Sequence, residues 1–225
     1  MGRLIAIEGI DGSGKGTQSQ MLVSSLNKSG FKAKLYSFPA YDSTFFGKEI
    51  GAFLRGEYGQ LNAVHPKLAA LLFASDRLEL KKCIEEDLAN GFYVICDRYV
   101  GSNVAHQAAK LKDADFEDFA TWVQTLEYEI FGLPRPDKVI FLDVPVSVSK
   151  DLVLRKKQRV YTADAEDLHE SDHTYMAKVY AAYKRLSISS GWDVITCVEH
   201  DHILSMEDIS NQLTRLISVE KTGKF

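Results

Sequence analysis

A glycine-rich stretch near the start of the chain has the residue types and the spacing needed to bind phosphate groups. Gly9, Gly14 and Lys15 fit the pattern G-x-x-x-x-G-K, between an apolar run and a helical pattern. Glycines let successive backbone N–H groups approach phosphate oxygens, and the N-terminus of the following helix adds partial positive charge. The lysine supplies an ammonium group for β- and γ-phosphates. A glycine-rich turn with a surface lysine is the alternative interpretation.

The hydroxyl that usually follows the lysine stands one residue later in this chain. Gly16 comes directly after Lys15, and Thr17 follows it. Many kinases of small molecules carry the same G-K-G-T order, so the pattern still predicts a loop for the phosphates of ATP. The residues expected to bind those phosphates are Gly12, Ser13, Gly14, Lys15, Gly16 and Thr17.

An acid and an arginine follow a second apolar segment, residues 93–96. Asp97 is expected to hold Mg²⁺ through water, opposite the phosphate loop, and the Thr17 hydroxyl is a second candidate ligand. The planar guanidinium of Arg98 suits the oxygens of a phosphoryl group during its transfer. A structural ion pair is the alternative for this acid and arginine.

Short apolar segments alternate with helical patterns along the chain. The predicted strands are residues 4–7, 33–38, 93–96, 139–142 and 194–198. The predicted helices are residues 15–26, 45–54, 66–89, 116–131, 146–158, 172–190 and 206–219. This alternation predicts an α/β protein with a three-layer P-loop NTPase fold, in which helices cover both faces of a five-stranded parallel sheet. Because such sheets bind ligands beyond the carboxyl ends of their strands, the phosphate loop, Pro39, Asp97 and Asp143 should lie on one rim.

Composition and charge argue against several classes of protein. The 225 residues are 45% hydrophobic and 26% charged, enough to bury a full core, and the net charge of −4 argues against a nucleic-acid or membrane-surface partner. The three cysteines, Cys83, Cys96 and Cys197, are scattered and odd in number, which favours thiols in a reducing compartment. A signal-peptide pattern and an apolar run of membrane length are both absent from the sequence, so a soluble cytoplasmic protein is expected.

Six stretches between Glu8 and Pro145 resemble the thymidylate kinase family of P-loop nucleoside monophosphate kinases. They are EGIDGSGKGTQ, FPAYDSTFFGK, LLFASDR, DRYVGSN, GLPRPD and FLDVP, in the family's order. The resemblance implies Mg²⁺-dependent transfer of the ATP γ-phosphoryl group to dTMP, giving dTDP and ADP for dTTP biosynthesis, with dUMP as a weaker substrate. It also implies a homodimer and a single kinase domain over residues 1–225, with a small lid around residues 153–171.

The same resemblance assigns residues to the sugar and the base of the nucleotide. Asp11 corresponds to the acid that hydrogen-bonds the 3′-hydroxyl and helps to order Mg²⁺. Phe73 corresponds to the aromatic residue that stacks on thymine, and Arg77 to the guanidinium that contacts the thymine carbonyl edge. These two are four residues apart, so they can share one helix face. The alternatives are a place in the core for Phe73 and a solvated helix end for Arg77.

Four more positions of the stretch after Arg98 fall near the nucleotide in the family. Ser102 and Asn103 lie where the family contacts the base, and Gln107 lies one helical turn further on. His106 corresponds to a position, often aromatic, beside the missing 2′-hydroxyl. A partly buried helix residue is the alternative for His106.

Phe38, Pro39 and Tyr41 belong to a segment that departs from the family's pattern. The commoner sequence is F-P-x-R, whose arginine grips the acceptor phosphate, and Tyr41 stands at the arginine's position. A tyrosine hydroxyl can hydrogen-bond a phosphate but brings no charge. The departure shifts the work of binding the acceptor phosphate to Arg98.

One catalytic arginine is expected in the lid. Family members carry it either beside the loop's acid or in the lid, and here Gly12 follows Asp11. The candidates are Arg155 and Arg159, between which the sequence does not choose, and the alternative is a solvated basic helix end. A lid arginine would stabilise charge on the transferring group only when the lid is closed. Glu170 corresponds to a lid-side acid near the nucleotide and the metal.

Three other functions compete with this interpretation. A kinase for a purine monophosphate would need a larger pocket, and the residues at the base positions argue for thymine. A GTP-binding switch should carry N-K-x-D after a later strand, whereas Asn27-Lys28 comes too early and lacks the aspartate. A nucleotide-binding regulator without catalysis stays open, although the loop lysine and the acid–arginine pair are present.

Overall fold

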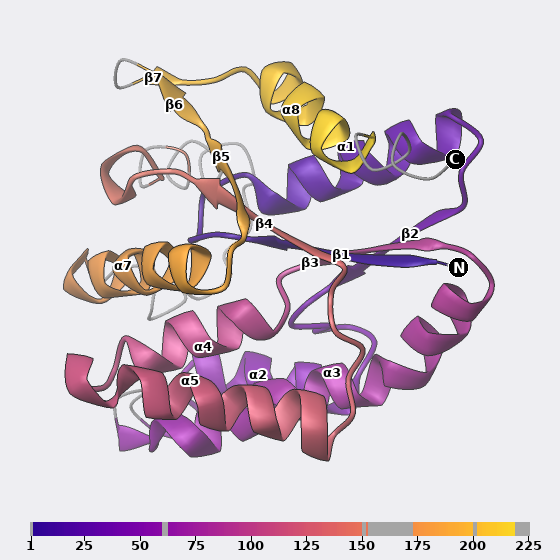
Figure 1. Ribbon diagram of the computed structural model, residues 1–225. Coiled ribbons are helices and arrows are strands. Elements are labelled where there is room, and N and C mark those ends of the chain that lie inside the picture. Colours follow the sequence, from indigo (N-terminus) through magenta and orange to yellow (C-terminus); the bar gives the residue numbers. More distant parts are fainter. Residues whose placement is uncertain (1, 60–62, 150–151, 153–172, 200–201, 219–225) are drawn as a thin grey trace.

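A five-stranded parallel sheet forms the centre of the molecule (Figure 1). The computed structural model describes residues 2–59, 63–149, 152, 173–199 and 202–218. The strands are β1 Arg3–Glu8, β2 Ala33–Ser37, β3 Tyr93–Asp97, β4 Lys138–Asp143 and β5 Asp193–Thr196. Their order across the sheet is β2-β3-β1-β4-β5, and each neighbouring pair is parallel. The predicted five-stranded parallel sheet is therefore confirmed.

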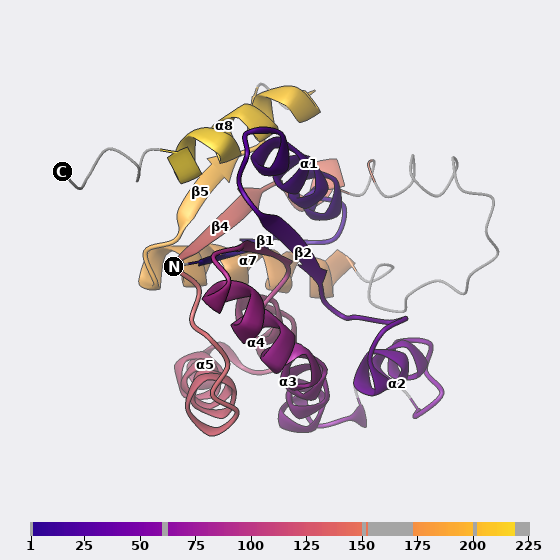
Figure 2. The ribbon, with the colours of Figure 1, turned by 90° about the vertical axis from the view of Figure 1, so that its right-hand side faces the viewer.

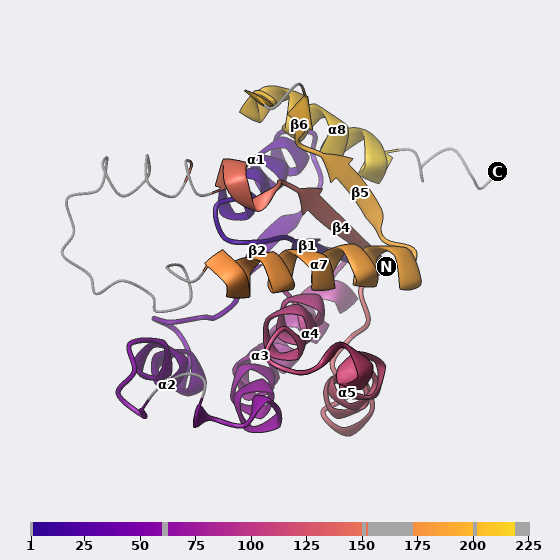
Figure 3. The same ribbon diagram turned by 90° about the vertical axis from the view of Figure 1, so that its left-hand side faces the viewer.

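Helices cover both faces of the sheet. They are α1 Lys15–Lys28, α2 Phe45–Leu54, α3 Pro66–Ala89, α4 Val100–Ala108, α5 Phe116–Gln124, α7 His173–Ser189 and α8 Met206–Ser218. In the three ribbon views α1 and α8 lie on one face, and α3, α4, α5 and α7 lie on the other (Figures 1, 2 and 3). The predicted three-layer arrangement is confirmed.

The side chains of β1 alternate between the two faces of the sheet, which explains why helices pack on both faces. Ile5 and Ile7 point to the face of α1 and α8, where they join a buried cluster that includes Leu22 and Leu213. Leu4 and Ala6 point to the opposite face and join the larger cluster formed with α3, α4, α5 and α7. Because side chains of a strand alternate between faces, a strand that is apolar throughout needs a cover on both sides.

Helix boundaries agree with the sequence in the long amphipathic segments and differ elsewhere. Helices α2 and α3 begin and end at the predicted residues. Helix α4 was not predicted, and the helix predicted for 116–131 is α-helical only to Gln124 and then π-helical over Thr125–Ile130. A short hairpin of β6 Val198–Glu199 and β7 His202–Ile203 follows β5. The helix predicted for 146–158 is seen over residues 146–149, and most of its remainder lies outside the described residues.

The two glycines of α2 give a test of how this helix is fixed to the segment before it. A Cβ on Gly47 would lie 2.3 Å from the Ala40 carbonyl oxygen, whereas a Cβ on Gly51 would meet the flexible end of Arg55 at 3.1 Å. We expect Gly47→Ala to lower the free energy of unfolding by about 1–3 kcal/mol, because backbone must move. Gly51→Ala is the matched control and should be neutral, or stabilising by up to about 1 kcal/mol. Urea denaturation measures both, and equal effects would contradict the prediction.

Candidate functional site

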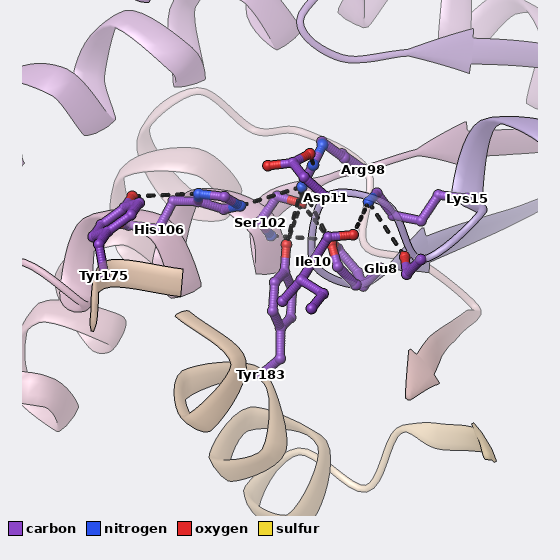
Figure 4. Close-up of polar contacts among 11 residues, drawn as sticks. Glu8, Ile10, Asp11, Lys15, Arg98, Ser102, His106, Tyr175 and Tyr183 are labelled. Carbon is purple, nitrogen blue, oxygen red and sulfur yellow. Dashed lines mark hydrogen bonds and ion pairs between the residues drawn. The ribbon is translucent and has the colours of Figure 1, made fainter. Parts of the chain in front are cut away.

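The predicted phosphate loop lies between β1 and α1, at the carboxyl end of the central strand. Gly14 precedes the helix with φ of 86°, a conformation that glycine adopts without strain. A Cβ on Gly9 would lie 2.7 Å from the Ser13 hydroxyl, so this tight turn also requires glycine. Lys15 is buried and donates a hydrogen bond of 2.7 Å to the carbonyl oxygen of Ile10 (Figure 4). The loop backbone therefore fixes the position of the Lys15 ammonium group through a hydrogen bond.

Burial makes Lys15 a weaker base than an ordinary lysine. Its pKa is lowered to about 8, first by desolvation and then by the positive charge of Arg98. Asp11, Asp97 and Glu8 act in the opposite direction. Anionic phosphates would favour the charged ammonium form, so binding of a nucleotide should raise this pKa.

Arg98 occupies the centre of the site. It is the one non-glycine residue of the described chain with positive φ, at 67°, and its N–H donates to the Ile7 carbonyl at 3.0 Å. The guanidinium forms an ion pair with Asp11 in the loop. Its Nη1 also lies 3.2–3.3 Å from the Gly9 carbonyl oxygen, Ser102 Oγ, His106 Nε2 and the Tyr183 hydroxyl (Figure 4).

Glu8 is a residue of the candidate site that the sequence analysis did not single out. Its carboxylate is fully buried and accepts hydrogen bonds from Tyr99 N at 3.0 Å, Ser102 N at 3.1 Å and Ser102 Oγ at 2.5 Å. Desolvation raises its pKa, while the Ser102 bond and Arg98 lower it. The sequence does contain a signal for it, because Glu8 is an acid at the end of the apolar strand β1.

Asp97 has an orphaned carboxylate oxygen. Oδ1 is buried and has no hydrogen-bond partner among the described residues, and a Cβ on Gly16 would lie 3.2 Å from Oδ2. Gly16 therefore faces this acid, and Thr17 is exposed on the first turn of α1. The described chain contains no cluster of three or more His, Cys, Asp or Glu side chains that would cage a metal. A lone carboxylate beside a phosphate loop fits Mg²⁺, which keeps several waters and binds substrate phosphates.

A pocket opens beside Arg98 and contains every described residue that was predicted to bind the acceptor nucleotide. Its lining consists of Asp11, Phe38, Pro39, Tyr41, Leu54, Phe73, Arg77, Arg98, Ser102, Asn103, His106 and Gln107. Asp76 of α3 accepts a hydrogen bond of 3.0 Å from Ala40 N, which fixes the segment of Phe38–Tyr41 against α3. The predicted residues among them come from four separate segments and converge on one cavity, but their contact with a nucleotide stays a prediction.

Phe73 and Arg77 differ in their surroundings. Phe73 is partly buried, lines the pocket, and packs edge-on against Phe53 with ring centroids 6.5 Å apart. Arg77 is only 2% exposed and is not a solvated helix end. Its guanidinium pairs with the buried carboxylate of Glu127, a residue that the sequence analysis did not consider.

His106 lies between the arginine and α7. Because Arg98 Nη1 can only donate, His106 Nε2 is the acceptor of that contact, and Nδ1 carries the proton toward the Tyr175 hydroxyl at 3.3 Å (Figure 4). The Tyr175 hydroxyl in turn donates to the His106 carbonyl oxygen at 2.8 Å. Three further predicted residues, Arg155, Arg159 and Glu170, lie outside the described residues.

Comparisons with known proteins identify the family of this chain. The family model for thymidylate kinase matches residues 7–201. The chain is 35% identical over 190 residues to the thymidylate kinase of Mycobacterium tuberculosis, covering 84% of this chain and 87% of that protein. It is 34% identical over 217 residues to that of Schizosaccharomyces pombe, covering 96% and 92%. The chain belongs to the thymidylate kinase family.

A solved structure gives the same assignment for the fold. The thymidylate kinase of Candida albicans superposes with a TM-score of 0.73 at 26% sequence identity, covering 98% of this chain and 92% of that one. Proteins of this family are nucleoside monophosphate kinases, so the chain is a phosphotransferase of that class. Among the described helices, none combines the length and apolar character needed to cross a membrane.

A second hollow lies on the other side of Glu8. Tyr128, Arg135, Lys138 and Trp192 are among the residues that line it. It contains none of the residues predicted for the nucleotide or the metal, so the pocket beside Arg98 is the candidate functional site.

The lowered pKa of Lys15 predicts how nucleotide affinity depends on pH. Below pH 8 the ammonium form predominates in the empty loop, and above it the loop must take up a proton to bind phosphate. The Kd of ADP should therefore rise with pH above about 8, by up to about tenfold per pH unit, with proton uptake on binding. Calorimetry between about pH 7 and 9.5, in buffers of different ionisation enthalpy, measures both. Lys15→Met should bind more weakly with a flatter profile, and a flat profile for the unmodified chain would contradict the prediction.

Proposed function

We propose that the protein transfers the γ-phosphoryl group of ATP to dTMP, giving dTDP and ADP. The observation that carries this proposal is the position of Arg98, which contacts the phosphate loop through Asp11 and Gly9 and also lines the pocket. A cation at that junction lies where donor and acceptor phosphates would meet. Because the acceptor is itself a phosphate oxyanion, the reaction needs charge neutralisation and alignment more than a strong base.

The phosphate loop would bind the donor. Backbone N–H groups of residues 12–17, at the start of α1, are suited to the phosphates of ATP, and the Thr17 hydroxyl is a further candidate donor. Lys15 would exchange its bond to the Ile10 carbonyl for one to a phosphate oxygen. Asp11, at the junction of loop and pocket, would accept a hydrogen bond from the sugar 3′-hydroxyl.

Mg²⁺ is proposed as the cofactor. When bound, it would neutralise charge on the transferring phosphate, and Asp97 would hold it through water. The orphaned oxygen of Asp97 and the space left by Gly16 support this assignment. Thr17 stays the second candidate, although its exposed side chain lies further along the helix surface.

The pocket would bind dTMP. Phe73 would stack on the thymine ring, and Arg77, Ser102, Asn103 and Gln107 would contact its edges. Phe38 and Pro39 would close the opposite wall. Tyr41 is 44% exposed at the rim, in keeping with a hydroxyl that reaches the acceptor phosphate.

The remaining assignments rest on the family and the composition. A lid over residues 153–171 would bring Arg155 or Arg159 to the transferring group and Glu170 to the nucleotide, and a homodimer is the proposed assembly. A single domain over residues 1–225 and a cytoplasmic location complete the proposal. The free thiols of Cys96 and Cys197 are buried, as expected in a reducing compartment.

The proposed function is tested by ADP release from Mg²⁺–ATP with dTMP, dUMP, UMP, AMP, GMP and CMP as separate acceptors. We expect the strongest turnover with dTMP, weaker turnover with dUMP, and little with the purine nucleotides, because stacking and edge contacts suit a pyrimidine. Turnover with UMP equal to that with dUMP would show that His106 does not discriminate at the 2′-position. ATP binding without turnover on any acceptor would contradict the proposal and favour a regulator.

The metal assignment predicts a separate effect of Asp97→Asn. Loss of the carboxylate charge should raise the Mg²⁺ concentration for half-maximal rate by about tenfold, whereas the Kd of dTMP should stay within about twofold. A Mg²⁺ titration of the rate at saturating ATP and dTMP measures the change. Asp115→Asn, in an exposed acid distant from the loop, is the matched control. An unchanged Mg²⁺ requirement would contradict the role of Asp97.

A further inference from the structure

Glu127 is a buried acid that hydrogen-bonds two residues of the pocket lining, Arg77 and Asn103. It lies in the π-helical segment Thr125–Ile130 and is fully buried. Its Oε2 accepts from Arg77 Nε at 2.5 Å, and its Oε1 accepts from Arg77 Nη2 at 2.7 Å. The same Oε1 accepts from Asn103 Nδ2 at 2.7 Å. One carboxylate therefore holds a residue of α3 and a residue of α4 at once.

These bonds fix the orientation of the Asn103 amide. Nδ2 donates both to Glu127 and to the Ala70 carbonyl oxygen at 2.9 Å. Both partners are acceptors, because one is a carboxylate oxygen that also accepts from Arg77 and the other is a backbone carbonyl, so the nitrogen must face them. The opposite end, Oδ1, is buried and has no hydrogen-bond partner among the described residues, although Asn103 lines the pocket. The pocket wall thus presents an acceptor.

Arg77 presents the complementary atom. Because Nε and Nη2 are engaged by Glu127, Nη1 is the nitrogen left for the pocket that Arg77 lines. The wall therefore offers one donor from Arg77 and one acceptor from Asn103. Gln107, from the same helix as Asn103, adds a second buried acceptor oxygen without a partner in the described chain.

This pattern matches one kind of pyrimidine edge. Thymine and uracil carry an acceptor, O4, next to a donor, N3–H, whereas cytosine carries a donor at position 4 next to an acceptor at N3. We propose that Glu127 is a positioning residue that sets the Arg77 donor and the Asn103 acceptor, and thereby selects a 4-oxo over a 4-amino pyrimidine. The inference rests on the proposed function and deepens it, since it concerns the base that the acceptor pocket takes.

Exchange of Glu127 for glutamine would break the pattern. A glutamine has one acceptor oxygen and one NH₂ group where the carboxylate has two acceptor oxygens. With the NH₂ group in place of Oε1, donor faces donor at Arg77 Nη2 and Asn103 Nδ2; with the NH₂ group in place of Oε2, donor faces donor at Arg77 Nε. Each orientation therefore removes a bond that sets the Asn103 acceptor or the Arg77 donor, and leaving a buried polar group unpaired is costly.

The test compares binding of dTMP and 5-methyl-dCMP, which differ only at the edge in question. Calorimetric titration is applied to the unmodified chain and to Glu127→Gln. The unmodified chain should bind dTMP at least about 100-fold more tightly than 5-methyl-dCMP. In the variant the Kd of dTMP should rise about tenfold or more, and the ratio of the two Kd values should fall about tenfold. The Kd of ADP should stay within about twofold.

Two further variants make the result decisive. Glu129→Gln is the matched control, because it removes the same charge from the same segment, in an exposed pair with Arg135, and should leave both Kd values unchanged. Glu127→Asp keeps the charge beside Arg77 but is one methylene shorter and cannot hold both partners, so it decides the question if Glu127→Gln fails to fold. A folded variant at position 127 with unchanged dTMP affinity and an unchanged ratio would overturn the proposal. This test concerns binding alone, so a chain that binds dTMP with the expected preference but does not convert it to dTDP contradicts the proposed function and leaves the role of Glu127 intact.

Discussion

The buried carboxylate of Glu8 joins the two segments on which the site depends. It ends β1, directly before the phosphate loop, and accepts hydrogen bonds from the backbone of the turn after β3 and from the start of α4. Parallel neighbours in a sheet are held together along their length by backbone bonds, but the loops beyond their ends are not. A side-chain acceptor with several bonds performs that task here, and its partner Ser102 also touches Arg98. The donor loop and the acceptor pocket are therefore parts of one hydrogen-bonded unit.

The contacts of this unit keep the backbone of Arg98 at a positive φ. A non-glycine residue with positive φ costs about 1–3 kcal/mol and persists only where its surroundings hold it. Three kinds of contact stabilise this conformation: the hydrogen bond of the Arg98 N–H to Ile7, the ion pair with Asp11, and the contacts of Nη1. The same arrangement places two cations, Arg98 and Lys15, close enough for the first to lower the pKa of the second. An incoming phosphate would relieve this repulsion, so the empty site is electrostatically prepared for an anion.

The sequence predicted the elements whose pattern is local and missed the contacts that are not. Helices α2 and α3 were bounded correctly because apolar periodicity and clear stop signals define them. Helix α4 was not predicted because its sequence, VGSNVAHQA, is short and includes a glycine, a serine, an asparagine and two β-branched valines, so tertiary packing decides its conformation. The residues that line the pocket were found through the resemblance to thymidylate kinases, since Phe73 and Arg77 lie in α3 and Asn103 lies in α4, where strand ends give no signal. Glu127 was not, since it meets Arg77 across 50 positions of the chain and lies in a π-helical turn that periodicity does not indicate.

The ion pair of Arg77 and Glu127 also has a consequence for how such a chain can diverge. Both side chains are almost completely buried, so removal of either one leaves the other as an uncompensated charge, a change that costs about 3–5 kcal/mol. Joint replacement by two apolar residues of similar volume is far less costly. Substitutions at positions 77 and 127 are therefore coupled in evolution, because a change at either position alone causes a large loss of stability. A lineage that loses one of the two charges is under selection to lose the other as well.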